Sequence, residues 1–239
     1  MRQSEFKLID RGFREALLLI PGWGLDYRIF DALDLRYNYL VSTLVWPPDF
    51  VSRLEEALRK SALERISILG HSMGGFLASD FTAKHPEKIA ELILVGVRKR
   101  YGAGDINPAR ENLKEHSAGF MYKMYDQAFS ASEKELLSHF KSTLLKIYIK
   151  GIDRALLNAG LDYLSEAEIT AKDLEHAHVR FIHGEADAIA PISEAEAIAS
   201  GLPDARFDRV KGGGHMLVLR KDFNSIFYGD EIGQKDGRQ

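Results

Sequence analysis

The sequence contains no cysteine, and this absence excludes several kinds of chemistry. Without thiols there are no disulfides, no zinc–thiolate sites and no cysteine nucleophile. The absence is compatible with a reducing compartment, so we expect a cytoplasmic protein. No metal site is expected either, because His176 and His178 stand two residues apart with nothing nearby to complete a set of ligands.

The chain also lacks long apolar runs and a strong charge of either sign. Its longest apolar runs have the length of a strand, well short of the ~18 residues that a membrane span needs. Residues 1–15 are polar and charged, so we expect no secretory signal and no membrane attachment. The formal net charge of −3 and a pI of about 6.3 argue against binding of nucleic acid by the whole domain. A soluble protein, monomeric by default, is the expectation.

Short apolar runs alternate along the chain with patterns typical of helices. The 239 residues are 45% hydrophobic, enough for one well-buried domain. Nearly continuous apolar runs are typical of parallel strands buried on both faces, and their alternation with helices predicts an α/β fold. The predicted sheet is mostly parallel, with helices on both faces. Its strands are expected at 16–20, 40–45, 66–69, 92–96, 179–182 and 205–210, with an antiparallel edge strand at 6–9, and helices at about 50–62, 74–84, 193–200 and 217–226.

Residues 98–172 interrupt this alternation. The segment has helical character and many aromatic residues at irregular spacing, between the predicted strands 92–96 and 179–182. We predict that it is a helical cap inserted over the C-terminal edge of the sheet. The core would then comprise residues 1–97 and 173–228. The last residues, 229–239, are polar and contain glycine, which predicts a flexible tail.

The most informative motif is Gly-His-Ser-Met-Gly-Gly at residues 70–75, because it follows a predicted strand and precedes a predicted helix. A G-x-S-x-G sequence in this setting is typical of a nucleophile elbow, a sharp turn that exposes the serine. Glycines on both sides relieve crowding in the strained turn. Ser72 is therefore the candidate nucleophile. The alternative is a glycine-rich turn with an incidental serine.

A serine nucleophile needs a base within reach and an acid that orients the base. Asp187 follows the predicted strand 179–182, and His215 follows the last strand after three glycines. The order Ser, Asp, His is the one that a nucleophile elbow of this kind requires. Asp187 taken alone could be a turn or helix-capping residue, and Glu185 is the second choice for the acid.

Two backbone N–H groups are needed to stabilise the oxyanion that forms during acyl transfer. The first is expected from Met73, which follows the nucleophile at the start of a helix. The second is expected from Trp23, in the glycine-flanked loop after the strand 16–20. The indole of Trp23 could also form a wall of the pocket or serve only in packing.

Apart from the cap and tail, the chain resembles the α/β-hydrolase superfamily. Within it, the loop at residues 22–25 and the compact cap resemble the pimeloyl-[acyl-carrier protein] methyl ester esterases of biotin synthesis. The resemblance implies an α/β-hydrolase fold and a serine carboxylesterase that needs no cofactor and acts on a small acyl ester. Two departures stand out: Pro21 where the superfamily usually has histidine, and His71 where the biotin enzymes usually have tryptophan.

Two other functional classes remain open at this stage. The same triad could serve a menaquinone-pathway lyase, a thioesterase or a peptidase. Alternatively, the chain could be a non-catalytic member of the fold that binds a ligand.

The charge is unevenly divided between the cap and the rest of the chain. Residues 98–154 contain eleven Lys and Arg against seven Asp and Glu, a net charge of +4, which leaves −7 for the remainder. Acyl-carrier proteins are strongly acidic, so a basic cap would attract one. Arg98, Lys99 and Arg100 form the densest cluster and are the predicted substrate or carrier contacts. The alternative is an ordinary solvated helical surface.

Overall fold

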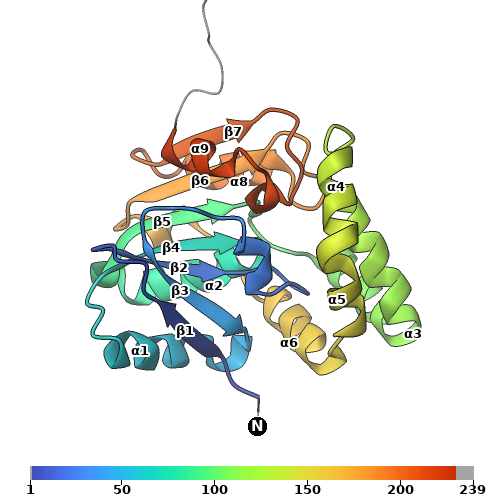
Figure 1. Cartoon of the computed structure of the whole chain (residues 1–239), viewed down its shortest axis with the longest axis horizontal. Helices are drawn as coiled ribbons and strands as arrows, with labels where there is room; N and C mark the ends of the chain where they lie inside the picture. Colours follow the sequence, from blue (N-terminus) through green and yellow to red (C-terminus); the bar gives the residue numbers. More distant parts are fainter. Residues whose placement is uncertain (1, 230–239) are drawn as a thin grey trace, which may run out of the picture.

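A seven-stranded, mostly parallel sheet forms the centre of the molecule (Figure 1). The computed structural model describes residues 2–229, so the predicted tail lies outside the described residues except for Gly229, which ends the last helix. The strand order is β1-β3-β2-β4-β5-β6-β7, and β1 alone runs antiparallel to its neighbour. The strands are β1 (Glu5–Ile9), β2 (Ala16–Ile20), β3 (Asn38–Leu44), β4 (Ile66–His71), β5 (Ile89–Val95), β6 (Val179–Gly184) and β7 (Arg206–Val210).

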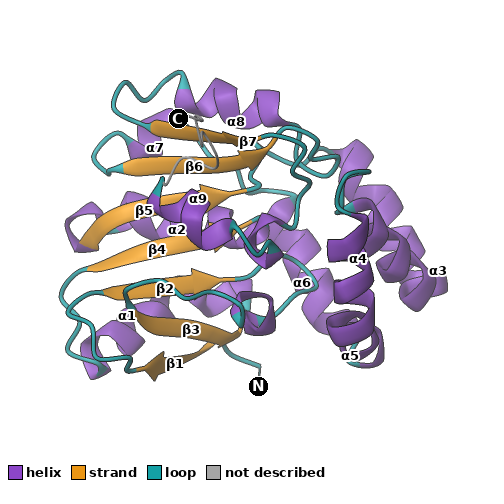
Figure 2. Ribbon diagram, turned by 45° about the horizontal axis from the view of Figure 1, so that its top comes forward, coloured by secondary structure: helices purple, strands orange, loops and turns teal. Residues whose placement is uncertain are grey.

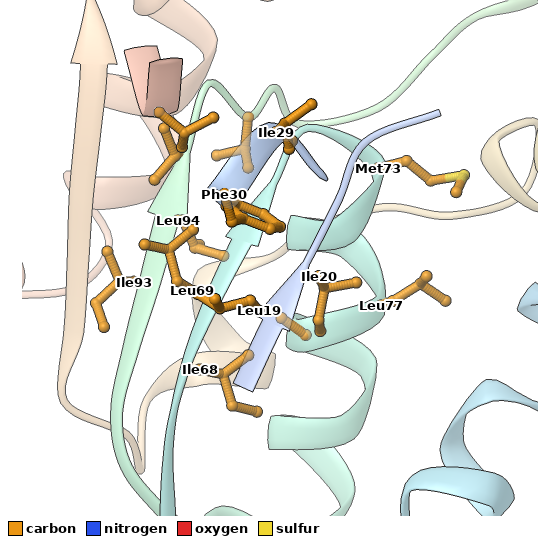
Figure 3. Packing of buried hydrophobic residues seen from close by; sticks show 14 of the residues in the cluster. Leu19, Ile20, Ile29, Phe30, Ile68, Leu69, Met73, Leu77, Ile93 and Leu94 are labelled. Carbon is orange, nitrogen blue, oxygen red and sulfur yellow. The ribbon is translucent and has the colours of Figure 1, made fainter. Parts of the chain in front are cut away.

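The predicted fold class is confirmed, down to the antiparallel edge strand at the N-terminus. Its basis is the burial of the central strands on both faces: every residue of β2, β4 and β6 is buried. Leu19, Leu69 and Ile93 stand in register across β2, β4 and β5, and their side chains join one apolar cluster (Figure 3). Burial of large apolar side chains of this kind contributes roughly 1.5–3 kcal/mol each.

Helices cover both faces of the sheet (Figure 2). The predicted helix at 217–226 is split, because Arg220 has an extended backbone and its side chain reaches Asp222 and the cap residue Glu133. The core helices are α1 (Phe50–Lys60), α2 (Met73–Lys84), α8 (Ile192–Ala199) and α9 (Phe223–Tyr228), with 3₁₀ turns η1 (Tyr27–Phe30), η2 (Pro47–Asp49), η3 (Pro86–Lys88) and η5 (Leu217–Leu219).

Most of the segment between β5 and β6 is helical, and its helices within residues 103–164 lie beyond the carboxyl ends of the parallel strands (Figure 2). The beginning and the end of this segment lie side by side, because the Ile169 N–H donates to Lys99 O at 2.9 Å. The predicted boundary at residue 172 falls inside α7, which packs on α2. The elements are α3 (Ala103–Gln127), α4 (Lys134–Phe140), a π-helical turn η4 (Lys141–Leu145), α5 (Lys146–Lys150), α6 (Arg154–Leu164) and α7 (Ala171–Leu174).

None of the helices within residues 2–229 is both long enough and apolar enough to cross a bilayer.

Candidate active site

Ser72 occupies the sharp turn between β4 and α2. Its backbone has φ 53° and ψ −120°, a conformation that costs a non-glycine residue of order 1–3 kcal/mol. The turn leaves no room for side chains at its two glycines. A Cβ on Gly70 would lie 2.5 Å from Gly74 O, and one on Gly74 would lie 2.2 Å from Ile20 O. Only glycine allows these approaches, as the sequence motif suggests. The Ser72 N–H donates to Val95 O at 2.9 Å, which ties the turn to β5.

Asp187 and His215 form a buried, hydrogen-bonded pair. The distance from His215 Nδ1 to Asp187 Oδ2 is 2.7 Å, and the Asp187 side chain is fully buried. The other carboxylate oxygen, Oδ1, accepts the N–H groups of Ile189 and Ala190 at 2.8 Å each. Burial alone would raise the pKa of Asp187, but the charge and hydrogen bond of His215 and the Ala190 N–H hold it below its ordinary value. Asp187 is therefore ionised and fixed, as an orienting acid must be.

Ser72 and His215 line the same cavity, which has a volume of about 150 Å³. The cavity lies between the strand ends and the cap, and most of its surface is apolar. Glu185 is exposed and its backbone pairs with β7, so Asp187 and not Glu185 contacts the histidine. The lining includes residues of α3 and α6 of the cap: Ile106, Ala109, Phe120, Met124, Tyr125, Leu161 and Leu164.

The loop that follows β2 lies directly against Ser72, the candidate nucleophile. A Cβ on Gly22 would stand 3.0 Å from Ser72 Cβ, and the loop closes with the Leu25 N–H donating to Gly22 O at 3.1 Å. Within residues 2–229, the backbone N–H groups of Trp23 and Met73 have no protein acceptor. Both are thus free to bind a developing negative charge.

The Trp23 indole forms a wall between two cavities. Its Nε1–H donates to Leu157 O at 2.8 Å, and the ring packs 6.3 Å from Phe120. Gly160 permits this position, since a Cβ there would lie 2.5 Å from the indole. The second cavity, of about 180 Å³, lies on the far side of the wall and is lined by Met73 and α5 residues.

Gly96 and Tyr101 contribute to the site, and the sequence reasoning overlooked both. Gly96 has φ +59°, and a Cβ there would lie 3.1 Å from His215 Nδ1 and 3.4 Å from Asp187 Oδ2. A glycine directly after the apolar run at residues 92–95 is the sequence signal for it. Tyr101 lines the cavity beside Ser72, and burial raises the pKa of its hydroxyl to about 12, so it stays neutral at pH 7.

His71 and His183 are buried supports of the site. His71 Nε2–H donates to His215 O at 3.0 Å, and His183 Nε2–H donates to Ala190 O at 2.8 Å. Burial lowers the pKa of His183, and it lowers that of His71 to about 3. Their Nδ1 atoms have no partner among the described residues. Both imidazoles are therefore neutral, and each holds a backbone carbonyl of the site.

The buried His71 predicts a loss of stability in acid. Its folded-state pKa of about 3 lies below the unfolded value of about 6.5, so only the unfolded chain takes up a proton between these values. The stabilising contribution is complete above pH 6.5 and declines as the pH falls, by roughly 2 kcal/mol between pH 7 and pH 5. Urea unfolding at both pH values measures this, with His71→Gln losing about that much less than wild type. Equal losses in the two proteins would contradict the prediction.

The basic cluster predicted at residues 98–100 is mostly neutralised by ion pairs. Arg98 is largely buried, stacks on Tyr101, and pairs with Glu194 at 2.7 Å and Asp105 at 3.7 Å. Lys99 pairs with Glu168 at 3.2 Å. Of the three, Arg100 alone has no ion pair within residues 2–229. The ion pairs of Arg98 and Lys99 leave less free positive charge at this point than the count of cations suggests.

Residues 2–229 contain no cluster of three or more His, Asp or Glu side chains arranged to hold a metal ion.

A strand–elbow–helix serine, an Asp–His pair and a cap over the strand ends define the class of the α/β-hydrolases. The chain belongs within this class to the family described as serine aminopeptidase, S33, whose model matches residues 46–222. The family makes the protein an enzyme of the hydrolase type.

Individual relatives are more specific. The pimeloyl-[acyl-carrier protein] methyl ester esterase of Aromatoleum aromaticum is 28% identical in an alignment that covers 86% of this chain and 93% of the relative. Among solved structures, a bromoperoxidase from Bacillus anthracis matches with a TM-score of 0.80 at 19% identity, over 93% of each chain. An esterase from Exiguobacterium antarcticum matches with a TM-score of 0.79 at 17% identity, over 95% of each chain. At these identities the two structures are similar in fold.

Proposed function

We propose that this hydrolase is a serine carboxylesterase in which Ser72, His215 and Asp187 form the catalytic triad. The observation that carries the proposal is the 2.7 Å contact from His215 Nδ1 to the buried Asp187, next to the cavity that His215 shares with Ser72. This contact fixes the proton on Nδ1 and leaves Nε2 free to accept one. A strained serine beside an oriented imidazole is the arrangement that activates a hydroxyl.

The geometry supports a two-step acyl transfer. His215 Nε2 takes the proton of the Ser72 hydroxyl as the oxygen attacks the ester carbonyl, and the carbonyl electrons move onto the oxygen. The Trp23 and Met73 N–H groups stabilise that oxyanion. When the intermediate collapses, His215 returns the proton to the leaving alcohol, and Ser72 holds the acyl group as an ester. Water, deprotonated by His215, then releases the carboxylic acid and restores Ser72.

The cavity favours an apolar acyl group of modest size. An apolar cavity of about 150 Å³ holds a molecule the size of benzene, which corresponds to about six carbon atoms. The relative from Aromatoleum aromaticum is named for a pimeloyl methyl ester, a chain of similar length. We therefore propose that the substrate is a medium-chain acyl ester, with pimeloyl-[acyl-carrier protein] methyl ester as the specific candidate.

One observation disfavours the aminopeptidase activity that the family's name describes. An aminopeptidase needs an unpaired anion near the serine to hold the substrate's amino group. Asp105 lines the cavity, but its Oδ2 accepts the Gly102 N–H at 3.0 Å and its Oδ1 faces the Arg98 guanidinium at 3.7 Å. Both of its carboxylate oxygens thus face groups of the protein, and most of the cavity surface is apolar, which favours a neutral ester over a peptide with a charged amino terminus.

A carrier protein would need cations on the outer face of the cap. Lys146 and Lys150 are exposed and lie one turn apart on α5, so they share a face. The same helix contributes Ile147 and Tyr148 to the second cavity. We propose these lysines, together with Arg100, as the contacts for an acidic carrier, in place of the paired Arg98 and Lys99.

The test compares pimeloyl-[acyl-carrier protein] methyl ester with dimethyl pimelate, a free ester of the same acyl chain. Charge reversal at Lys146 and Lys150 is expected to lower kcat/KM for the carrier-linked ester about tenfold through KM, because each exposed contact contributes about 0.2–1 kcal/mol. Dimethyl pimelate should be turned over as by wild type. Lys172→Glu, an exposed lysine on α7, is the control.

Equal losses on both substrates would contradict the carrier contact. If neither substrate is hydrolysed by the wild-type enzyme, the choice of acyl chain is wrong. A fluorophosphonate adduct on the wild-type protein, measured by intact mass, reports on the serine hydrolase activity independently of the substrate.

A further inference from the structure

The loop that carries His215, residues 212–215, is bound to the cap as well as to the core. The cap segment that joins α3 to α4, residues 128–133, lies directly against it. The His215 N–H donates to Ala128 O at 2.8 Å. A Cβ on Gly214 would lie 2.7 Å from Ser130 N and 2.9 Å from Ala128 O. The third glycine of the loop is thus required because cap backbone occupies the space that a side chain would take.

Two serines of the cap segment add a second set of contacts. The hydroxyl groups of Ser130 and Ser132 both donate to Gly212 O, at 2.6 Å and 2.8 Å. Gly212 has φ +67°, in the left-handed region. The first residue of the histidine loop is therefore held by side chains of the cap, just as the last is held by its backbone.

Glu133 joins both segments through a buried carboxylate. Its side chain is 4% exposed, and Oε2 accepts the Gly214 N–H at 2.9 Å and the Ser130 N–H at 3.0 Å. The Arg220 guanidinium, which also pairs with Asp222 at 2.7 Å, faces Oε1 at 3.4 Å. A buried carboxylate that accepts two backbone N–H groups is a strong and directional link.

We infer that Glu133 is a positioning residue for His215, so that the seating of the cap on the core determines how well the triad is aligned. The imidazole of His215 is fixed at Nδ1 by Asp187, and its backbone is fixed by Ala128 and His71. Glu133 binds the N–H of Gly214, the residue immediately before His215. The inference rests on the proposed triad and extends it: the cap encloses the substrate and also completes the base.

The coupling has a consequence for the reaction. A displacement of about 1 Å in a catalytic group costs about 100-fold in rate. A substrate or carrier protein that shifts the cap would move the 128–133 segment, and with it the 212–215 loop. Full activity therefore requires the seated cap, in addition to a filled cavity.

The test measures kcat and KM separately on p-nitrophenyl butyrate for two variants of Glu133. Glu133→Ala removes the acceptor of both N–H groups and is expected to lower kcat about 10- to 100-fold, with KM changed by less than about threefold. Glu133→Gln retains an acceptor oxygen and is expected to recover to within about fivefold of wild type. Glu135→Ala, at an exposed position on α4, is the matched control and should behave as wild type.

A spectroscopic measurement separates alignment from stability. The proton on His215 Nδ1 should give a low-field NMR resonance in the wild-type protein that His215→Ala removes. Glu133→Ala is expected to shift or broaden it, and Glu133→Gln to restore it. This readout needs no substrate. If wild type shows the resonance but forms no fluorophosphonate adduct, the proposed function is wrong, whereas the positioning role is still tested by the resonance.

The inference is overturned if Glu133→Ala keeps wild-type kcat and an unchanged resonance, or if Glu133→Gln loses as much kcat as Glu133→Ala. Should Glu133→Ala fail to fold, the double variant Ser130→Ala with Ser132→Ala removes the hydroxyl contacts at a more exposed part of the segment. We expect it to lower kcat about threefold to tenfold with KM unchanged. A wild-type kcat in the double variant would then overturn the inference.

Discussion

Replacement of Ser72 with alanine is expected to lower kcat on p-nitrophenyl butyrate by about 10⁴- to 10⁶-fold, the range seen when the nucleophile of a triad is removed. The Ser72 hydroxyl oxygen is the atom proposed to attack the ester carbonyl, and alanine has no such atom. Residual turnover should come from direct attack of water on the ester, with the oxyanion donors still stabilising the intermediate. Stopped assays with long incubation measure the loss, and circular dichroism checks the fold.

Ser79→Ala is the matched control for this prediction. Ser79 is also buried and belongs to the same helix, α2, where its hydroxyl donates to Gly75 O at 2.8 Å. It does not line the cavity. This variant should keep kcat within about twofold of wild type, because an intrahelical hydroxyl bond affects stability by only about 1 kcal/mol. Turnover by Ser72→Ala within tenfold of wild type would contradict the assignment, as would a fluorophosphonate adduct on that variant.

The strands and the elbow could be predicted because their physical signals are local. A strand buried on both faces, such as β2, appears in the sequence as an unbroken apolar run. The requirement for Gly70 and Gly74 likewise arises within a few residues of the turn. The three residues of the proposed triad could be predicted to lie close together because parallel strands all end at one edge, so residues that follow different strands meet there.

The contacts between cap and core could not be predicted, because they join residues far apart in the chain. Ser130 and Gly212 are 82 residues apart, and the cap segment between α3 and α4 has no motif that indicates a partner. Charge counting failed at Arg98 for a related reason. A count of cations in the cap cannot reveal that Glu194, a residue of the core helix α8, lies 2.7 Å away and neutralises that arginine.

A second large effect is expected from Asp187→Asn, which leaves the size of the side chain unchanged. The N–H groups of Ile189 and Ala190 both point at Oδ1, so the amide oxygen of asparagine should take that place. Its NH₂ group would then face His215 Nδ1 and donate to it. The imidazole would carry its proton on Nε2, toward Ser72, and could no longer accept the serine proton. A reversed tautomer of this kind costs about 10⁴-fold in kcat.

The measurement is kcat on p-nitrophenyl butyrate at pH 7, with Glu185→Gln as the control that tests the second candidate acid. Glu185 is exposed, so its variant should retain wild-type kcat. A loss in Glu185→Gln with wild-type activity in Asp187→Asn would transfer the orienting role to Glu185. The expected result, a large loss in Asp187→Asn alone, follows from the two N–H groups at Oδ1. With aspartate, these N–H groups bind Oδ1 and leave Oδ2 to accept the proton of His215 Nδ1. With asparagine, they would bind the amide oxygen and leave the NH₂ group facing His215, which reverses the tautomer of the imidazole and inactivates it.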